Sequence, residues 1–201
     1  MFDERICAED GCDNPCADGQ TRCCRHLPPE TTDGIAAAIC RELHGSRLWK
    51  NKNLSFLTFR NEDFSGKRIY SCSFFGTCFE NCRFDGSRFF SNNFENAVFK
   101  NCSFRNTESK YNIVGNADMI DTVFCESDIL HSNFIGIKAV NVDFSETDLY
   151  SSTFCRADLD NVNLSNCNLK KTDFRNSKRH QVTFRYSNYE EACFDGGDPE
   201  S

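Results

Sequence analysis

The N-terminal 26 residues contain cysteines and a histidine at spacings that suit a metal ion. The skeleton is C-x4-C-x10-C-x2-H, formed by Cys7, Cys12, Cys23 and His26. Zinc takes four thiolate or imidazole ligands in a tetrahedron, and two closely spaced pairs let short loops supply them. Cys16 and Cys24 are alternative ligands that could replace one of the four. The sequence predicts a structural zinc site; the other interpretations are metal-free thiols or an iron–sulfur cluster.

The remaining histidines do not stand in a pattern typical of catalysis. The chain has four His, of which His44, His131 and His180 lie outside the zinc motif. There is no glycine-rich phosphate loop. A five-residue period also runs unbroken from Leu54 to Phe194, which leaves no long insertion in which a cleft could form. Three cysteines and one histidine would also fill the coordination sphere of zinc, leaving no open position for a reaction. We therefore expect a protein without enzymatic activity.

A period of five residues runs from Leu54 to Phe194 without a break. Of the 29 positions in this frame, 26 carry large apolar side chains, most often Phe. The position two residues earlier is nearly always small, as at Cys72, Thr77 and Ala97. Neither a helix nor a strand keeps residues five apart on one face. The pattern therefore predicts a chain that turns once per repeat and buries one large and one small side chain each time.

This pattern resembles the pentapeptide-repeat family, whose motif is a small residue, any residue, Leu or Phe, and two further residues of any type. The resemblance implies an all-β fold, a right-handed quadrilateral β-helix of about seven coils, each built from four pentapeptides and stacked roughly 4.8 Å apart. Central residues 20 apart would then form ladders, such as Phe64, Phe84, Phe104 and Phe124. The Cys/His motif is similar to the small zinc knuckle that precedes the repeats in some bacterial members, where a Cys-x-x-His-x-Pro end recurs.

A short helix is expected between the zinc motif and the repeats. Asp33 is a suitable N-cap and Gly45 a suitable C-terminal residue, and an apolar stripe lies between them, at Ile35, Ala38, Ile39 and Leu43. We expect this helix to cover the open end of the first coil, with help from Leu48 and Trp49, because the ends of a stacked solenoid need caps. The predicted organisation is a Cys/His-rich segment at 1–31, the helix and a linker at 32–50, the β-helix at 51–196 and a tail at 197–201.

Three central positions break the repeat: Ser109, Ala139 and Arg179. Ser109 predicts a local bulge and Ala139 a modest cavity. Arg179 is the sharpest departure, because an unpaired buried guanidinium is costly. We expect the coil there to deform and turn Arg179 outward, and the alternative is a switch or a partner contact.

One column of outward residues is a candidate partner-binding stripe. The residues directly after the central ones, taken every 20, include four large apolar side chains: Tyr70, Phe90, Leu130 and Tyr150. Aligned exposed apolar residues often mark partner sites, although they could instead simply pack along the wall of the rod. At the other end of the chain, no capping helix is predicted after Phe194, so the C-terminal coil is a candidate homodimer interface.

Charge and composition narrow the range of functions that the protein could have. The net charge is −7, but residues 52–196 carry 17 Lys and Arg against 19 Asp and Glu. The first hypothesis is a scaffold or adaptor that binds an unidentified protein partner. The alternatives are a DNA-mimicking regulator of DNA gyrase or topoisomerase of the quinolone-resistance kind, which would need a strongly negative rod, and nucleic-acid binding through the zinc knuckle, which the acidity disfavours. The absence of a signal peptide or apolar span, together with 14 Cys, predicts a cytoplasmic protein without membrane contact.

Overall fold

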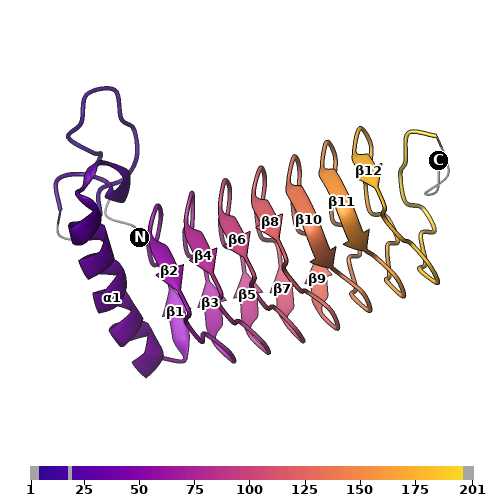
Figure 1. Cartoon of the computed structure of the whole chain (residues 1–201), viewed down its shortest axis with the longest axis horizontal. Helices are drawn as coiled ribbons and strands as arrows, with labels where there is room; N and C mark the ends of the chain where they lie inside the picture. The colour runs from indigo at the N-terminus through magenta and orange to yellow at the C-terminus, as the bar shows by residue number, and fades with distance from the viewer. Residues whose placement is uncertain (1–4, 18–19, 197–201) are drawn as a thin grey trace.

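The computed structural model describes residues 5–17 and 20–196, which form a rod with a helix at its N-terminal end (Figure 1). The predicted tail at 197–201 lies outside the described residues. A 3-10 turn, η1 (Cys24–His26), leads into helix α1 (Pro29–Gly45), and twelve strands follow. The rod is a parallel β-solenoid, as the five-residue period predicts.

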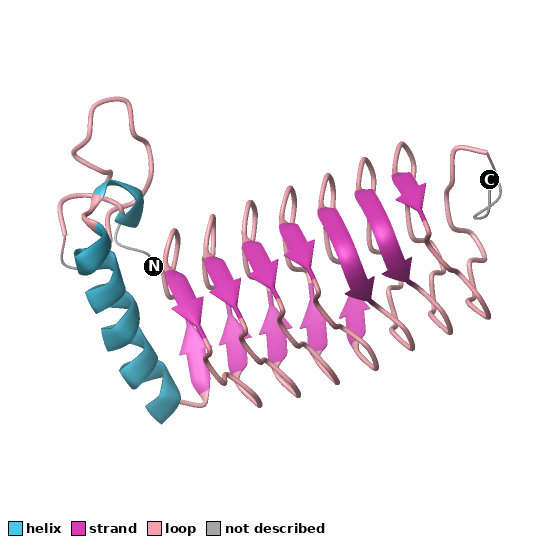
Figure 2. Cartoon of the chain, in the orientation of Figure 1, coloured by secondary structure: helices cyan, strands magenta, loops and turns pink. Residues whose placement is uncertain are grey.

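Each strand pairs in parallel with a strand from the coil before or after it, 20 residues away, as in Phe59↔Phe79 and Ile69↔Phe89. Two sheets result, on opposite sides of the rod (Figure 2). One contains β1 (Leu48–Lys50), β3 (Arg68–Tyr70), β5 (Arg88–Phe90), β7 (Glu108–Lys110) and β9 (Asp128–Leu130). The other contains β2 (Thr58–Arg60), β4 (Cys78–Glu80), β6 (Val98–Lys100), β8 (Asp118–Ile120), β10 (Lys138–Asp143), β11 (Asp158–Asn163) and β12 (Lys178–His180).

The other two sides of the rod are columns of single bridges with the same spacing, such as Asn53↔Ser73 and Asp63↔Arg83. The cross-section is therefore four-sided. One strand per coil in the seven-stranded sheet corresponds to seven coils, the number that the sequence predicts.

Ladders of aromatic rings fill the rod. Phe84 stacks on Phe104 with ring centroids 4.7 Å apart, and Phe104 stacks on Phe124 at 4.8 Å. Phe64 lies 5.3 Å from Phe84 in a tilted arrangement. This confirms the predicted ladder. Stacks at this spacing combine apolar burial with favourable ring geometry, which makes each coil depend on its neighbours.

The small residues occupy the corners and satisfy backbone groups there. The Thr77 hydroxyl donates to the Leu54 carbonyl at 2.7 Å, and the Ser87 hydroxyl donates to the Phe64 carbonyl at 3.0 Å. Both side chains are fully buried. A larger side chain would collide with the corner, and a corner hydroxyl meets a carbonyl that would otherwise lack a partner.

Asparagine recurs at the turns because the turn backbone is left-handed. The second residue after most central positions has positive φ, for example 57° at Asn61, 54° at Asn81 and 52° at Asn101. Asn tolerates this region better than most residues. The amides also form a ladder: Asn81 Nδ2 donates to Asn61 Oδ1 at 3.0 Å, and Asn101 Nδ2 donates to Asn81 Oδ1 at 2.8 Å.

Helix α1 packs beside the first coil, as predicted, but it begins earlier than expected. It starts at Pro29, so the assignment of Asp33 as N-cap was wrong. Proline suits the first helical position, where its missing N–H costs nothing. The buried face consists of Ala36, Cys40 and Leu43. At the other end of the helix, Lys67 Nζ from the rod donates to the carbonyl oxygens of Leu43 at 2.9 Å and of His44 at 3.2 Å.

The repeat itself begins one pentapeptide before the predicted start. Trp49 lies in β1 in the central frame, opposite Ile69, and is 1% exposed. Its ring meets Phe64 edge-on at 4.8 Å, and its Nε1 donates to the Leu43 carbonyl at 3.3 Å. Trp49 is therefore both the first core residue of the rod and its link to the cap.

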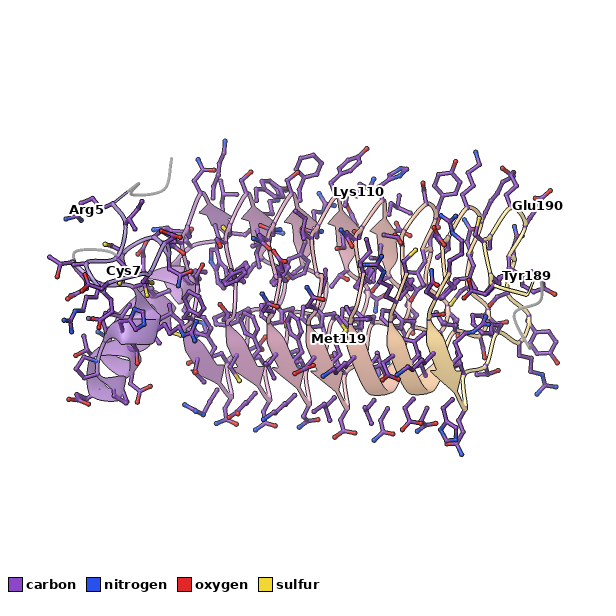
Figure 3. The ribbon with its side chains drawn as sticks, turned by 90° about the horizontal axis from the view of Figure 1, so that it is seen from above. Arg5, Cys7, Lys110, Met119, Tyr189 and Glu190 are labelled. Carbon is purple, nitrogen blue, oxygen red and sulfur yellow. The ribbon has the colours of Figure 1, made fainter. Side chains whose placement is uncertain are left out.

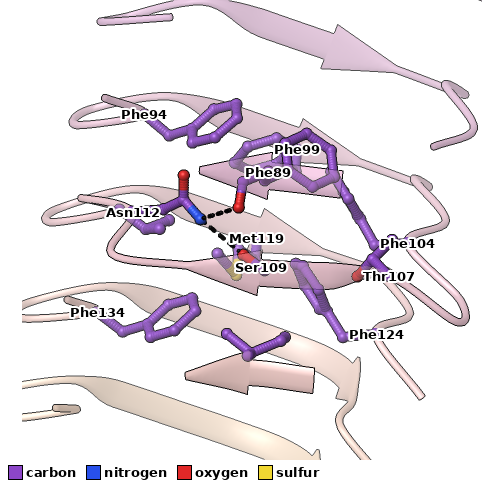
Figure 4. Close-up of a pocket in the computed structure, with 12 residues that line it drawn as sticks. Phe89, Phe94, Phe99, Phe104, Thr107, Ser109, Asn112, Met119, Phe124 and Phe134 are labelled. Atoms are coloured by element: carbon purple, nitrogen blue, oxygen red, sulfur yellow. Dashed lines mark hydrogen bonds between the residues drawn. The ribbon is translucent and has the colours of Figure 1, made fainter. Parts of the chain in front are cut away.

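The bulge predicted at Ser109 is absent. Ser109 lies in β7 in register with Phe89 and Ile129. A cavity of about 30 Å³ takes up the missing side-chain volume, and Phe104, Met119 and Phe124 are among its lining residues (Figure 4). Asn112 Nδ2 donates to Ser109 Oγ at 2.8 Å and to the Phe89 carbonyl at 3.4 Å. The ladder on both sides holds the register, so the coil keeps its shape around a small side chain.

We expect Ser109→Leu to stabilise the rod, because leucine would fill this largely apolar cavity. The gain should be about 1 kcal/mol, since Asn112 loses one acceptor but keeps the Phe89 carbonyl. The measurement is the midpoint of thermal unfolding, with a rise of roughly 3 °C. A fall in the midpoint would show that leucine does not fit the cavity and would contradict this prediction.

Arg179 and Ala139 also keep the register. Arg179 lies opposite Leu159 in β12, so the expected deformation of the coil is absent. Its guanidinium lies 5.1 Å from the centroid of the Phe194 ring, and the residue is half-buried. A cation over an aromatic face offsets part of the cost of burial. Ala139 is fully buried and does not line the cavity beside Ser109.

Candidate metal centre and aromatic face

The four predicted zinc ligands lie together at the N-terminal end of the rod, where Figure 3 labels Cys7. One ligand atom from each of Cys7, Cys12, Cys23 and His26 lies within 4.8 Å of the others. The Cys12 and Cys23 sulfurs are 3.9 Å apart, and His26 Nδ1 lies 3.4 Å from Cys7 Sγ and 3.6 Å from Cys23 Sγ. A zinc tetrahedron has edges of about 3.8 Å between sulfurs and about 3.5 Å between sulfur and nitrogen. The donor set therefore fits zinc.

The local structure supplies hydrogen bonds suited to thiolates. The backbone N–H of Cys23 donates to Cys7 Sγ at 3.3 Å, and Asn14 Nδ2 donates to Cys12 Sγ at 3.3 Å. Donors of this kind orient metal ligands and favour their charged form. Burial opposes ionisation of Cys7, but hydrogen bonds from the backbone of Cys23 and Glu9 and from the side chains of His26 and Cys23 outweigh it and lower the pKa of its thiol to about 6. Burial and the adjacent Cys7 raise the pKa of Cys23 to about 11.

The two alternative ligands lie elsewhere. Cys16 is buried, and its thiol donates to the Ile6 carbonyl at 3.2 Å. Cys24 opens η1 and packs against the core together with Ile35 and Ile39 of α1. These positions leave both sulfurs outside the group of four. Cys24 instead joins the knuckle, the segment up to Leu27, to the helix.

The knuckle has little structure of its own. Within residues 5–17 and 20–27, its strand-like pairing is a single antiparallel bridge, Ile6↔Pro15, with backbone hydrogen bonds such as Cys7 N–H to the Asn14 carbonyl at 2.9 Å. A segment this short cannot form an independent apolar core. Its fold therefore depends on the metal-ligand group and on contact with α1.

The predicted stripe lies on the sheet that contains β3, β5, β7 and β9, and Tyr150 continues its column one coil beyond β9. Phe90 is 44% exposed, whereas Tyr70, Leu130 and Tyr150 are half-buried. Lys110 occupies the middle of the same column and lies at the upper edge of the rod in Figure 3. The apolar side chains are thus aligned, and only Phe90 among them is widely open to solvent.

Sequence reasoning missed two members of this surface, Tyr111 and His131. Tyr111 lies 5.5 Å from Phe90 edge-on and stacks on His131 at 5.3 Å, and His131 meets Tyr150 at 5.6 Å. Tyr70 contacts Phe90 at 6.4 Å. The contact chain therefore moves to the neighbouring column for two coils and then returns. We call the set Tyr70, Phe90, Tyr111, Leu130, His131 and Tyr150 the aromatic face.

Other candidate chemical groups are part of the scaffold. His180 Nδ1 lies 2.7 Å from Asp160 Oδ1, and His44 Nε2 lies 2.7 Å from Glu62 Oε2. Burial raises the pKa of the thiols of Cys82 and Cys167 to about 11 and that of Cys102 to about 12. Those cysteines stay protonated at neutral pH and pack as small corner residues.

The C-terminal end of the rod leaves inward-frame side chains uncovered. Tyr189 occupies a central position yet is 47% exposed, and Phe194 is half-buried while stacked on Phe174 at 5.1 Å. Figure 3 labels Tyr189 at this end. Within residues 5–17 and 20–196, no helix or strand follows β12.

A rod whose four sides are each built from stacked five-residue units belongs to the solenoid class of repeat proteins. The family model for pentapeptide repeats matches residues 68–106 and 140–176, with eight copies. The chain belongs to the pentapeptide-repeat family. No curated protein matches the chain in sequence.

Solved structures to which this chain is similar include two at 15% identity. HetL from the cyanobacterium Nostoc, described as involved in heterocyst differentiation regulation, is matched over 80% of this chain and 97% of its own length, with a TM-score of 0.48. QnrB1, described as a plasmid-mediated fluoroquinolone resistance protein, is matched over 74% of this chain and 93% of its own length, with a TM-score of 0.39. Within the described residues, no helix combines the length and apolarity needed to cross a membrane.

Proposed function

We propose that this protein is a non-catalytic scaffold that binds another protein through the aromatic face, with zinc as a structural element of its N-terminal knuckle. The observation that carries the proposal is the continuous contact chain from Tyr70 to Tyr150 on the outside of a rigid rod. Aromatic side chains supply much of the binding energy of protein interfaces. A preorganised rod also loses little conformational entropy when it binds.

The surroundings of the histidines support the non-catalytic part of the proposal. His131 lies between the rings of Tyr111 and Tyr150, and His180 pairs with Asp160. Neither arrangement places a nucleophile against a base in the way that covalent catalysis requires. The zinc would have four protein ligands, which is the pattern of structural sites.

The surface charge favours a protein scaffold over a DNA mimic. On the sheet opposite the aromatic face, Lys138 lies between Asp118 and Asp158, and Lys178 follows Asp158. Elsewhere Arg60 pairs with Glu80 at 2.9 Å. Alternating signs neutralise the long negative field that a mimic of duplex DNA needs. In a gyrase supercoiling assay we therefore expect no inhibition or protection by this protein.

The test of the scaffold is affinity capture from the lysate of the source organism. We expect the intact protein to retain a specific partner and Tyr70→Ser/Tyr150→Ser to lose it, because both edges of the aromatic face lose their rings. Tyr186→Ser is the matched control, since Tyr186 is 75% exposed near the C-terminal end. Full retention of every partner by the double variant would exclude the aromatic face as the binding surface.

A further inference from the structure

We propose that the aromatic face binds the same face of a second copy of this chain, with the two rods antiparallel. The inference rests on the proposed function of this face and names its partner. It starts from the order of side chains along the column Tyr70, Phe90, Lys110, Leu130 and Tyr150, in which neighbours lie one coil apart. This column has the same pattern from either end: tyrosine, apolar, lysine, apolar, tyrosine.

A two-fold axis perpendicular to the rod, passing beside Lys110, brings this column onto its own copy. Tyr70 then meets Tyr150 of the second copy, and Phe90 meets Leu130 of the second copy. In a two-fold interface every such contact occurs twice, so one surface must be complementary to itself. The column from Tyr70 to Tyr150 meets that requirement, because its residue types are symmetric about Lys110. The strand register places these residues one above the other.

The neighbouring outward column selects the antiparallel orientation. Its N-terminal half is positive, at Arg68 and Arg88, and its C-terminal half is negative, at Asp128 and Asp148, with Glu108 between them. The same axis places Arg88 opposite Asp128 and Arg68 opposite Asp148. A parallel arrangement in the same register would set like charges against each other, which costs binding energy.

The centre of the interface is also balanced in charge. Glu108 and Lys110 are the two ends of β7, and both lie on the axis. Each residue on the axis also meets its own copy, so the two Glu108 and the two Lys110 come close together, and each Lys110 offsets this repulsion by turning toward Glu108 of the second copy, two residues away along the strand. Arg88 Nη2 already lies 2.9 Å from Glu108 Oε1 within the chain, so the arginine is held in the face.

The shape of the surface is also complementary to itself about this axis. A hollow of about 310 Å³ lies beside Tyr111, lined by Ser71, Ser91, Asn93 and Ile113 among others. In the antiparallel pair, Ser91 faces His131 of the second copy, so the exposed imidazole enters this hollow while the two Tyr111 rings meet on the axis. A second hollow of about 140 Å³, lined by Tyr70, Arg88, Phe90 and Lys110 among others, receives Leu130.

The size of the face sets the expected strength. From Tyr70 to Tyr150 is four coil spacings, or about 19 Å at the β-sheet repeat. A patch of this length corresponds to an interface near the lower end of the specific class, about 1,000 Å² in total. We therefore expect a weak, reversible dimer that forms at micromolar to near-millimolar protein concentrations.

A charge swap across the axis tests the proposal. Sedimentation equilibrium of the full-length, zinc-loaded protein should give a monomer–dimer equilibrium. Arg88→Glu alone and Asp128→Arg alone should each weaken dimerisation at least about tenfold, because each creates two like-charge contacts. The double variant Arg88→Glu/Asp128→Arg should return the dissociation constant to within about threefold of the original, since opposite charges face each other again.

The controls separate this interface from others. Arg83→Glu alters an exposed arginine that pairs with Asp63 on a different side of the rod and should leave the dimer unchanged. Each variant is first shown to be folded by circular dichroism. A single-chain mass at all concentrations would overturn the proposal. So would a dimer that ignores the charge swap but is lost in Tyr189→Asp, because that result places the contact at the C-terminal coil predicted from the sequence.

The outcomes also distinguish this inference from the proposed function. A monomeric protein whose Tyr70→Ser/Tyr150→Ser variant loses another partner would overturn the self-association and leave the scaffold in place. A dimer that obeys the charge swap, in a protein whose double tyrosine variant keeps every partner, would support self-association and reject the face as the docking site for other proteins.

Discussion

Chelation of zinc is expected to unfold the knuckle up to Leu27 while the rod stays folded. In its described part the knuckle has one strand-like bridge, and so short a segment cannot form a core of its own, so metal binding must supply its folding free energy. Structural zinc in comparable small motifs contributes about 10–16 kcal/mol at neutral pH. Hydrogen exchange measured by mass spectrometry should show fast exchange at Cys7 and Cys23 after chelation and unchanged protection in β4 to β11. Unchanged protection of the knuckle would contradict the metal assignment.

Ligand substitutions make the same prediction more specific. Cys23→Ser should abolish stoichiometric zinc, because Cys23 is fully buried and contacts Cys12 and His26 within the group. Cys16→Ala is the matched control: it removes a buried cysteine whose thiol bonds to the Ile6 carbonyl instead. Zinc content per chain by elemental analysis separates the two, and cobalt replacement should give the visible absorption of tetrahedral thiolate coordination in the control alone.

The affinity for zinc should fall as the pH is lowered. Without metal, Cys7 has its pKa lowered to about 6, so it is mostly thiolate at neutral pH and becomes protonated below that value. Cys23, with its pKa raised to about 11, must lose a proton whenever zinc binds. Metal binding therefore releases protons, and acid opposes it. A zinc titration with a competing chelator at several pH values should show weakening that steepens below about pH 6.

The period of five was enough to predict most of the rod. It shows which residue of each repeat faces inward, and a 20-residue coil then determines every strand pairing, as in Phe79↔Phe99. The two irregularities that the sequence predicted, a bulge at Ser109 and a deformed coil at Arg179, do not occur. At Ser109 the strands on both sides impose the register around a small cavity, and at Arg179 the pairing with β11 imposes it while the guanidinium lies over the Phe194 ring. The cooperativity of stacking outweighs a single unsuitable residue.

Local signals were less informative at the cap and at the corners. Asp33 has a side chain suited to an N-cap, but the helix begins at Pro29 with Pro28 as its N-cap, five residues earlier than that assignment implies. Trp49 fits the central frame, because it lies five residues before Leu54. It was missed because the predicted frame begins at Leu54. Tyr111 and His131 were missed because their corner backbone is left-handed, with φ of 57° and 50°, so the sequence alone does not give the direction of their side chains.

Phe84→Ala should cost the rod about 3–5 kcal/mol of unfolding free energy, the second large effect that we expect. Phe84 is fully buried, stacks on Phe104 at 4.7 Å and meets Phe79 edge-on at 5.3 Å. Its removal leaves a gap that the rigid ladder cannot close, because the coils above and below are held by their own hydrogen bonds. Urea unfolding followed by circular dichroism gives the free energy, and a change in slope would reveal that the two halves of the rod unfold separately.

Phe90→Ala is the matched control for this substitution. It removes the same side chain from the same coil, but Phe90 is 44% exposed, and its aromatic contacts among the described residues are the outer rings of Tyr70 and Tyr111. We expect a loss below about 1 kcal/mol. The pair separates two roles of phenylalanine in one coil: a central residue such as Phe84 stabilises the rod, whereas a residue that follows a central one, as Phe90 follows Phe89, is available for binding. Equal losses in the two variants would mean that the aromatic face is part of the core energetics rather than a free surface.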